Sequence, residues 1–177
     1  MSSPASVAKH PIHPMLVAFP IGLLNFSLFA DLMHHSGNGK DAWKEVANRS
    51  MMGGIAGALA AAVPGFVDYL SLKGRAKKIG TAHMAMNLSI VGLYGYNLWR
   101  RTKSPESKLP VALSAIGSAG LFVSGWLGGE LVYVHGSGVE SEEERKKAEI
   151  EEKAIPEKPG EMQGEKTQVG RTTGVIR

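Results

Sequence analysis

The sequence contains no cysteine, and this absence excludes several classes of protein. Disulfide-stapled secreted domains, thiolate iron–sulfur clusters, cysteine-ligated zinc, a catalytic thiol and covalently attached c-type haem all need cysteine. The sequence also lacks a P-loop, a nucleophile elbow, an HExxH motif and a dinucleotide-binding fingerprint. Whether the chain is an enzyme stays open at this point, and we expect that it is not one by itself.

Long stretches of the chain also lack charge. Residues 140–177 carry ten acidic and eight basic residues, whereas the first 139 residues carry twelve basic and only six acidic ones. Within that first part, Lys and Arg are absent from four apolar segments and gather between them. Because a basic side chain at the centre of a bilayer is costly, this segregation is typical of a membrane protein.

The four apolar segments cover about residues 15–33, 50–72, 83–99 and 109–134. Each is long enough for the roughly 17–25 helical residues that cross a hydrocarbon core of about 30 Å. Residues 51–67, MMGGIAGALAAAVPGFV, have no polar face such as a helix of a soluble bundle carries. The sequence predicts an all-α protein, with residues 1–139 forming an up-down four-helix transmembrane bundle whose main partner is the lipid bilayer.

Small residues recur at every fourth position in two of these segments, and such ridges let helix backbones approach closely in a membrane. The residues are Gly53, Gly57, Ala61 and Gly65 in the second segment, and Gly120, Ser124 and Gly128 in the fourth. The basic residues that flank the segments are almost equally divided between the two sides. The positive-inside rule therefore does not orient the protein.

Residues 140–177 are predicted to form a separate charged tail. Glu/Lys pairs at helical spacing between Glu140 and Lys153 predict a short helix. The Pro-containing, polar sequence beyond Ile155 has little to bury, so we expect disorder there. Composition alone leaves open whether this tail binds a partner or only solubilises the chain.

Several polar residues are predicted to share one face of the membrane. In an up-down bundle, the starts of the first and third spans lie beside the ends of the second and fourth. The residues at these positions are His10, His13, Asp68, His83, Glu130 and His135. Asp31, His34 and His35 are expected at the opposite face.

This cluster suggests a cofactor site. His83 and His135 are the predicted axial ligands of a b-type haem, because they lie near small residues on adjacent antiparallel helices at similar expected depth. His13 is a substitute ligand. Two facing imidazoles and a low-dielectric pocket would be what the protein supplies.

Carboxylates add further possibilities at the same face. Asp68 and Glu130, together with His10, are expected to orient the haem ligands through hydrogen bonds. Alternatively, a zinc or iron ion is held by His83, His135, Asp68 and Glu130. A network that only hydrogen-bonds helix ends, without any cofactor, is equally compatible with these residues.

Four motifs in a fixed order resemble the bacterial DUF2231 family of predicted four-helix membrane proteins. They are HPIHPMLVAFPIGLL, GFVDYL, AHMAMN and GWLGGELVYVHGSGV, and the resemblance covers about residues 10–139. It implies a multi-pass protein of the bacterial cytoplasmic membrane whose function is unassigned. Some relatives are joined to Rieske iron–sulfur domains, which would suit electron transfer, but this chain lacks such a domain and its cysteines.

Three hypotheses for function follow. The first is an integral membrane protein with one b-type haem that passes electrons to or from a redox partner or a quinone. The second is a structural or assembly subunit of a membrane complex, without a cofactor of its own. The third is metal or proton handling by the same cluster. Nucleic acid is not an expected partner, because no aromatic residues are interleaved with the basic clusters.

Overall fold

The computed structural model describes residues 3–8, 10–37, 40–103 and 107–139, and six residues of the tail. Four long helices dominate it: α1 (Ile12–His35), α2 (Lys40–Ser71), α3 (Gly74–Lys103) and α4 (Leu109–Gly129). A π-helical turn, η1 (Glu130–Val134), continues α4. The predicted all-α class is confirmed. A two-residue antiparallel ribbon of β1 (Ser6–Val7) and β2 (His10–Pro11), which the sequence pattern did not predict, precedes α1.

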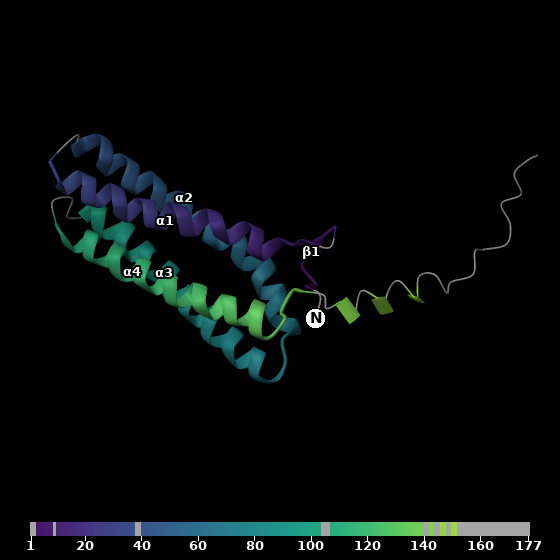
Figure 1. Cartoon of the computed structure of the whole chain (residues 1–177). Helices are drawn as coiled ribbons and strands as arrows, with labels where there is room; N and C mark the ends of the chain where they lie inside the picture. The colour runs from purple at the N-terminus through teal and green to yellow at the C-terminus, as the bar shows by residue number, and fades with distance from the viewer. Residues whose placement is uncertain are drawn as a thin grey trace, which may run out of the picture. The chain divides into compact units, whose positions relative to one another are not determined.

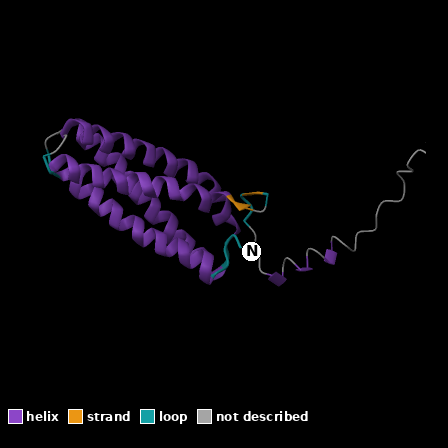
Figure 2. Ribbon diagram, turned by 45° about the horizontal axis from the view of Figure 1, so that its top comes forward, coloured by secondary structure: helices purple, strands orange, loops and turns teal. Residues whose placement is uncertain are grey.

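The helices form two antiparallel hairpins, α1–α2 and α3–α4, that lie side by side (Figures 1 and 2). The link between the hairpins consists of Leu72 and Lys73, and Gly74 begins α3 with a φ of +55°. Gly37, with a φ of +98°, follows the end of α1. Glycine adopts these left-handed conformations without the steric cost that a Cβ imposes, which permits the sharp reversals.

Three observed helices extend beyond the predicted spans, α1 by a few residues and α2 and α3 by longer stretches. α2 begins before residue 50 and α3 begins before residue 83, because charged turns continue each helix past its apolar part. By length and composition, α1, residues 41–71 of α2, and α4 with η1 can each cross a membrane. α3 is not among these spans, because basic residues occupy both of its ends and Asn87 and Asn97 interrupt its apolar part. Its crossing of the membrane stays a prediction.

The bundle exposes large apolar side chains and buries small and polar ones. Phe122 and Trp126 on α4 are 76% and 77% exposed, and Leu88 on α3 is 63% exposed. The buried polar residues include Ser27, Asp31, Asn97, Ser114, Ser118 and Ser124. A water-soluble bundle has the opposite distribution, so the outer surface of this one suits the hydrocarbon of a lipid bilayer.

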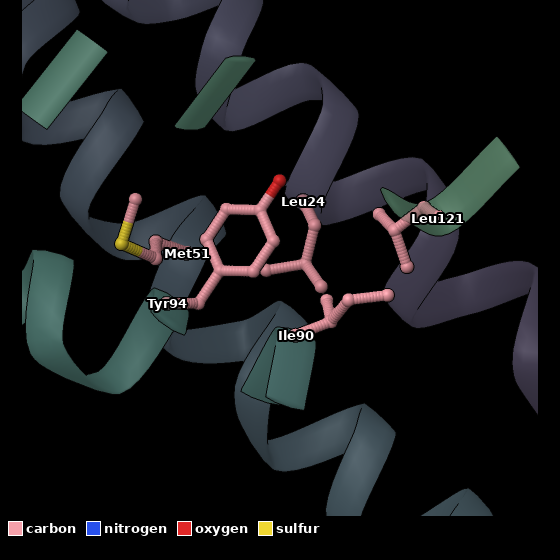
Figure 3. Close-up of a cluster of buried hydrophobic side chains, with 5 residues drawn as sticks. All are labelled: Leu24, Met51, Ile90, Tyr94 and Leu121. Carbon is pink, nitrogen blue, oxygen red and sulfur yellow. The ribbon is translucent and has the colours of Figure 1, made fainter. Parts of the chain in front are cut away.

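The apolar core lies where all four helices meet. Leu24 of α1, Met51 of α2, Ile90 and Tyr94 of α3, and Leu121 of α4 form one buried cluster (Figure 3). The Tyr94 hydroxyl donates to the Ser114 carbonyl oxygen at 3.2 Å, so the ring is buried without leaving a polar atom unpaired.

The two hairpins are built to one sequence pattern. Positions in α1 correspond to positions 70 residues later in α3, as the pair His13 and His83 illustrates. IGLL at 21–24 of α1 corresponds to VGLY at 91–94 of α3, and GIAG at 54–57 of α2 corresponds to GSAG at 117–120 of α4. The chain is therefore an internal repeat of one helical hairpin.

Contacts within the hairpins repeat in the same register. A Cβ on Gly54 would lie 2.6 Å from Leu24, and a Cβ on Gly117 would lie 2.6 Å from Tyr94. Leu24 and Tyr94 are equivalent positions, as are the two glycines. The two hairpins thus pack by the same close approach of a glycine to a large side chain.

A side-chain hydrogen bond repeats as well. The Ser27 hydroxyl donates to the Ala47 carbonyl oxygen at 2.8 Å in the first hairpin. The equivalent Asn97 donates to the Pro110 carbonyl oxygen at 2.9 Å in the second.

Equivalent residues of α1 and α3 also meet each other across the bundle. His13 contacts His83 at one end, and Asp31 contacts Arg101 at the other. Equivalent positions can touch only close to a twofold axis. The hairpins are therefore related by an approximate twofold axis that runs along the bundle, and these two pairs lie beside it.

The tail is a separate unit, residues 142–177. Its described residues have helical backbone; they are Glu142, Glu143, Lys146, Lys147, Ile150 and Glu151. The disorder expected beyond residue 155 lies outside the described residues.

Candidate functional site

The first feature of the candidate site is the pair of imidazoles on the twofold axis. His13 belongs to the first turn of α1, and His83 lies in α3 of the other hairpin. Their ring centroids are 6.5 Å apart and their planes are nearly perpendicular, at 84°. Each hairpin thus contributes one ring to a shared position.

The two rings are held in the same way. The Nδ1 atom of His13 lies 2.8 Å from the Ala61 carbonyl oxygen, and Nδ1 of His83 lies 3.0 Å from the Ser124 carbonyl oxygen. A carbonyl oxygen only accepts hydrogen bonds, so each Nδ1 carries the hydrogen and, in a neutral ring, each Nε2 is an acceptor. This is the tautomer and the support that metal-binding histidines commonly have. Nε2 of His83 accepts a hydrogen bond from the Asn87 side chain at 3.2 Å.

Glycines form the notches in which the rings lie. A Cβ on Gly65 would lie 2.7 Å from the His13 ring, and a Cβ on Gly128 would lie 3.2 Å from the His83 ring. Gly65 lies one helical turn after Ala61, and Gly128 lies one helical turn after Ser124, the residues whose carbonyl groups bond to the two rings. The small-residue ridges predicted on the second and fourth spans therefore have a specific use here, since they admit the two imidazoles.

Asn87 distinguishes the two halves of the site. Its side-chain nitrogen lies 2.7 Å from the Ser124 hydroxyl, 2.8 Å from the His83 carbonyl oxygen and 3.2 Å from Nε2 of His83. The equivalent position on α1 is Val17, which has no polar side chain. Within the described part of the chain, Nε2 of His13 has no hydrogen-bond partner.

The structure brings His83 to His13, the predicted substitute ligand, while the pairing of His83 with His135 as axial ligands stays a prediction. His135 follows η1, seven residues beyond Gly128, the residue that packs on His83. Seven helical residues span roughly 10 Å, which carries His135 past the level of the His83 ring. In the described residues His135 makes no ring contact or hydrogen bond with His83, and it instead lines a cavity beside Leu72 and Lys73.

The remaining residues of the predicted cluster have separate roles. Asp68 accepts hydrogen bonds from the Ser3 hydroxyl at 2.6 Å and from the Ala5 backbone at 3.3 Å, so it fixes the segment before β1. His10 is exposed and its Nδ1 bonds to the Ala8 carbonyl oxygen at 2.8 Å.

Glu130 begins η1 and is half-buried. Across the ranges that the structure describes, no three His, Asp or Glu side chains come together as metal ligands. The four-residue metal site of His83, His135, Asp68 and Glu130 stays a prediction.

At the other end of the axis lies a buried ion pair that the sequence pattern did not reveal. Two nitrogens of the Arg101 guanidinium donate to the two carboxylate oxygens of Asp31, at 2.7 Å and 2.5 Å. The side chains are only 9% and 5% exposed, respectively. Arg101 belongs to a basic cluster between spans, where a solvated or headgroup role is the usual expectation.

Amides and a hydroxyl complete this ion pair. Arg101 also donates to Asn48 and Ser114, each at 3.2 Å, and the Ser114 hydroxyl donates to Asp31 at 3.0 Å. A cavity of about 20 Å³, room for roughly one water molecule, borders the pair. The internal repeat is the sequence signal that points to this contact, because Asp31 and Arg101 occupy equivalent positions.

Comparison with known proteins places the chain in a family. Residues 9–141, three quarters of its length, match the DUF2231 family, described as a predicted membrane protein. The chain belongs to the DUF2231 family. The search of curated proteins and the search of solved structures gave no match.

The DUF2231 match covers both hairpins and leaves most of the tail outside. It agrees with the helices that are long and apolar enough to cross a membrane. This DUF2231 chain is thus a multi-pass membrane protein. Its function has to be inferred from the arrangement of its own side chains.

Proposed function

We propose that this DUF2231 protein binds one b-type haem between His13 and His83 and transfers electrons. The observation that carries the proposal is the pair of imidazoles on the twofold axis, one from each hairpin, both anchored through Nδ1. This ligand pair replaces the predicted pair of His83 and His135, with the substitute ligand His13 taking the place of His135.

The number of protein donors supports haem over a bare metal ion. A structural zinc site takes four protein ligands and a catalytic one takes three, whereas haem iron already has four porphyrin nitrogens and needs only axial ligands. In the described residues, no third His, Asp or Glu joins the two imidazoles as a ligand group. Two histidines therefore suffice for haem and not for zinc.

The spacing of the rings is compatible with a single group bound by both imidazoles. Two imidazoles that both bound one metal ion through bonds of ~2 Å would have ring centres up to about 6 Å apart. The observed separation of the centroids is 6.5 Å. A group bound by both rings would lie between the hairpins.

Each residue of the site has a definite task in this proposal. His13 and His83 would hold the haem through Nε2, which on His83 would give up its hydrogen bond from Asn87. The carbonyl groups of Ala61 and Ser124 fix the ring orientations and would raise the basicity of the ligands. Asn87 positions His83 through the His83 carbonyl and the Ser124 hydroxyl. When bound, the haem supplies one-electron redox chemistry, with a potential set by the ligands and the low dielectric of the bundle.

The proposal includes a redox partner, either a protein or a quinone, and a place in the cytoplasmic membrane of a bacterium. A cofactor-free subunit of a membrane complex and a metal- or proton-handling protein stay the alternative predictions. Neither is favoured by a specific contact in the structure.

The direct test is the optical spectrum of the full chain purified from haem-replete cells. We expect a Soret band that shifts on reduction with dithionite, and a pyridine haemochrome of the b type. His13→Ala and His83→Ala should each abolish or strongly weaken the band, whereas His10→Ala, which alters an exposed ring, should keep it. A colourless wild-type preparation would refute the proposal.

Two further variants separate ligand geometry from folding. Gly65→Ala retains both histidines but places a methyl group against the His13 ring, so we expect an altered Soret band in a folded protein. His135→Leu should leave the spectrum unchanged. Loss of haem in His135→Leu, with retention in His13→Ala, would assign the axial role to His135 instead.

A further inference from the structure

A second site lies at the end of the bundle where α2 turns into α3 and where η1 ends. It is a cavity of about 250 Å³. Its lining combines the α2–α3 link, the first turn of α3 and the segment after η1: Leu72, Lys73, Arg75, Ala76, His135 and Ser137. None of these residues belongs to the imidazole pair, so this site goes beyond the proposed function.

His135 lines this cavity, and one of its polar atoms is unsatisfied. Its Nε2 atom is buried and has no hydrogen-bond partner in the described part of the chain. Leaving a buried polar group unpaired costs about 1–3 kcal/mol, so such atoms normally have a partner. A ligand with hydrogen-bonding oxygens in the cavity would supply one.

The positive charge of the lining residues favours an anionic ligand. Lys73 and Arg75 are exposed at the rim, and among the residues that the structure describes no carboxylate lines the cavity. The first turn of α3 contributes the positive end of the helix dipole and contains no acidic residue. Lys77 is already engaged, since it donates to the Tyr69 carbonyl oxygen at 2.8 Å and lies over the Tyr69 ring.

The residues around the cavity indicate the source of the anion. The cavity lies just beyond the ends of two helices that are long and apolar enough to cross a membrane, where lipid headgroups are expected. Leu70, Tyr133 and Val134, beside the lining residues in sequence, are 62%, 89% and 70% exposed. Exposed apolar side chains next to a basic cavity match a molecule with a phosphate and acyl chains.

We propose that this cavity binds the phosphate group of an anionic phospholipid from the surrounding bilayer. Lys73 and Arg75 contact the phosphate, His135 hydrogen-bonds to it through Nε2, and the acyl chains lie against the exposed apolar residues of α2 and η1.

The test measures lipid binding to the full chain in detergent by native mass spectrometry, titrating phosphatidylglycerol and phosphatidylcholine separately. We expect saturable binding of phosphatidylglycerol that exceeds that of phosphatidylcholine. The double variant Lys73→Gln/Arg75→Gln should weaken phosphatidylglycerol binding about ten-fold or more. His135→Leu should weaken it several-fold, and circular dichroism checks that each variant is folded.

Lys78→Gln is the matched control, because Lys78 is an exposed lysine in the same part of α3 that does not line the cavity. It should bind phosphatidylglycerol like the wild type. Equal loss in this control and in the double variant would overturn the proposal, as would equal binding of the two lipids. Inorganic phosphate that binds saturably without any lipid preference would also overturn it, by identifying a site for free phosphate.

Discussion

At the scale of single residues, the ion pair of Asp31 and Arg101 shows how the repeat differs between its copies. Equivalent positions carry opposite charges, and their side chains meet beside the twofold axis. At the other end, the equivalent positions carry the same residue, histidine. Two histidines can bind one ligand together. The opposite charges of Asp31 and Arg101 instead neutralise each other and need no ligand.

Exchange of the two charged residues tests this symmetry. Asp31→Arg and Arg101→Asp each leave like charges buried together, and we expect each to lower the free energy of unfolding by about 3–5 kcal/mol. The double variant Asp31→Arg/Arg101→Asp should recover at least half of that loss, because the positions are equivalent. Unfolding in detergent, followed by circular dichroism, gives the measurement.

The exposed pair of Arg49 and Glu45, at 2.6 Å, provides the control. Its side chains are 74% and 58% exposed, so Arg49→Ala should change the free energy of unfolding by at most about 0.5 kcal/mol. A double exchange no more stable than either single variant would show that the two positions are not interchangeable.

At the scale of elements, glycine decides how the helices of a hairpin pack. Lipid tails are as apolar as leucine, so the helices gain little from burying apolar area and depend on close contact instead. Gly54 and Gly117 provide it in equivalent places, beneath Leu24 and Tyr94. Gly125 of α4, by contrast, faces open space, with nothing within 4 Å of where its Cβ would lie.

Alanine substitutions of two glycines of α4 test this packing argument. In Gly117→Ala the new methyl group lies 2.6 Å from the buried Tyr94 ring, so we expect a loss of about 1–3 kcal/mol in the free energy of unfolding. Gly125→Ala meets nothing within 4 Å and should be neutral or stabilise by up to about 1 kcal/mol. Equal effects in thermal unfolding would contradict the packing argument.

At the scale of the whole molecule, the question is whether α3 crosses the membrane. Three spans have the length and composition to do so. The exposed Leu88, Tyr96 and Trp99 on α3 face outward like the apolar residues of the other helices. Its polar residues Asn87 and Asn97 bond within the bundle, to Ser124 and Ser114, which removes the cost of placing amides at membrane depth.

The absence of cysteine makes this crossing directly measurable. Lys78 and Lys103 are both exposed and lie near opposite ends of α3. In sealed vesicles, a membrane-impermeant maleimide should label Lys78→Cys and Lys103→Cys from opposite sides. Ser36→Cys, after α1, should share its side with Lys103→Cys. Labelling of both α3 positions from one side would mean that α3 does not cross.

The sequence by itself determined the helical class, the membrane setting and the approximate place of each helix. These properties depend on local composition: apolar length for crossing lipid, basic residues confined between spans, and small residues for close packing. Topology alone also placed His13 and His83 at one end of the bundle. This placement could be predicted because, in an up-down bundle, the starts of the first and third helices must lie at the same end.

Only the tertiary structure decided which of these residues meet. The rotation of each helix and its rise along the axis determine that His83 faces His13, that His135 lies beyond it, and that Arg101 reaches Asp31. Apolar periodicity gives little information on rotation in a membrane, because lipid and core are both apolar. Contacts such as Gly54 with Leu24 and Gly117 with Tyr94 fix that rotation, and they exist only when the hairpins have formed.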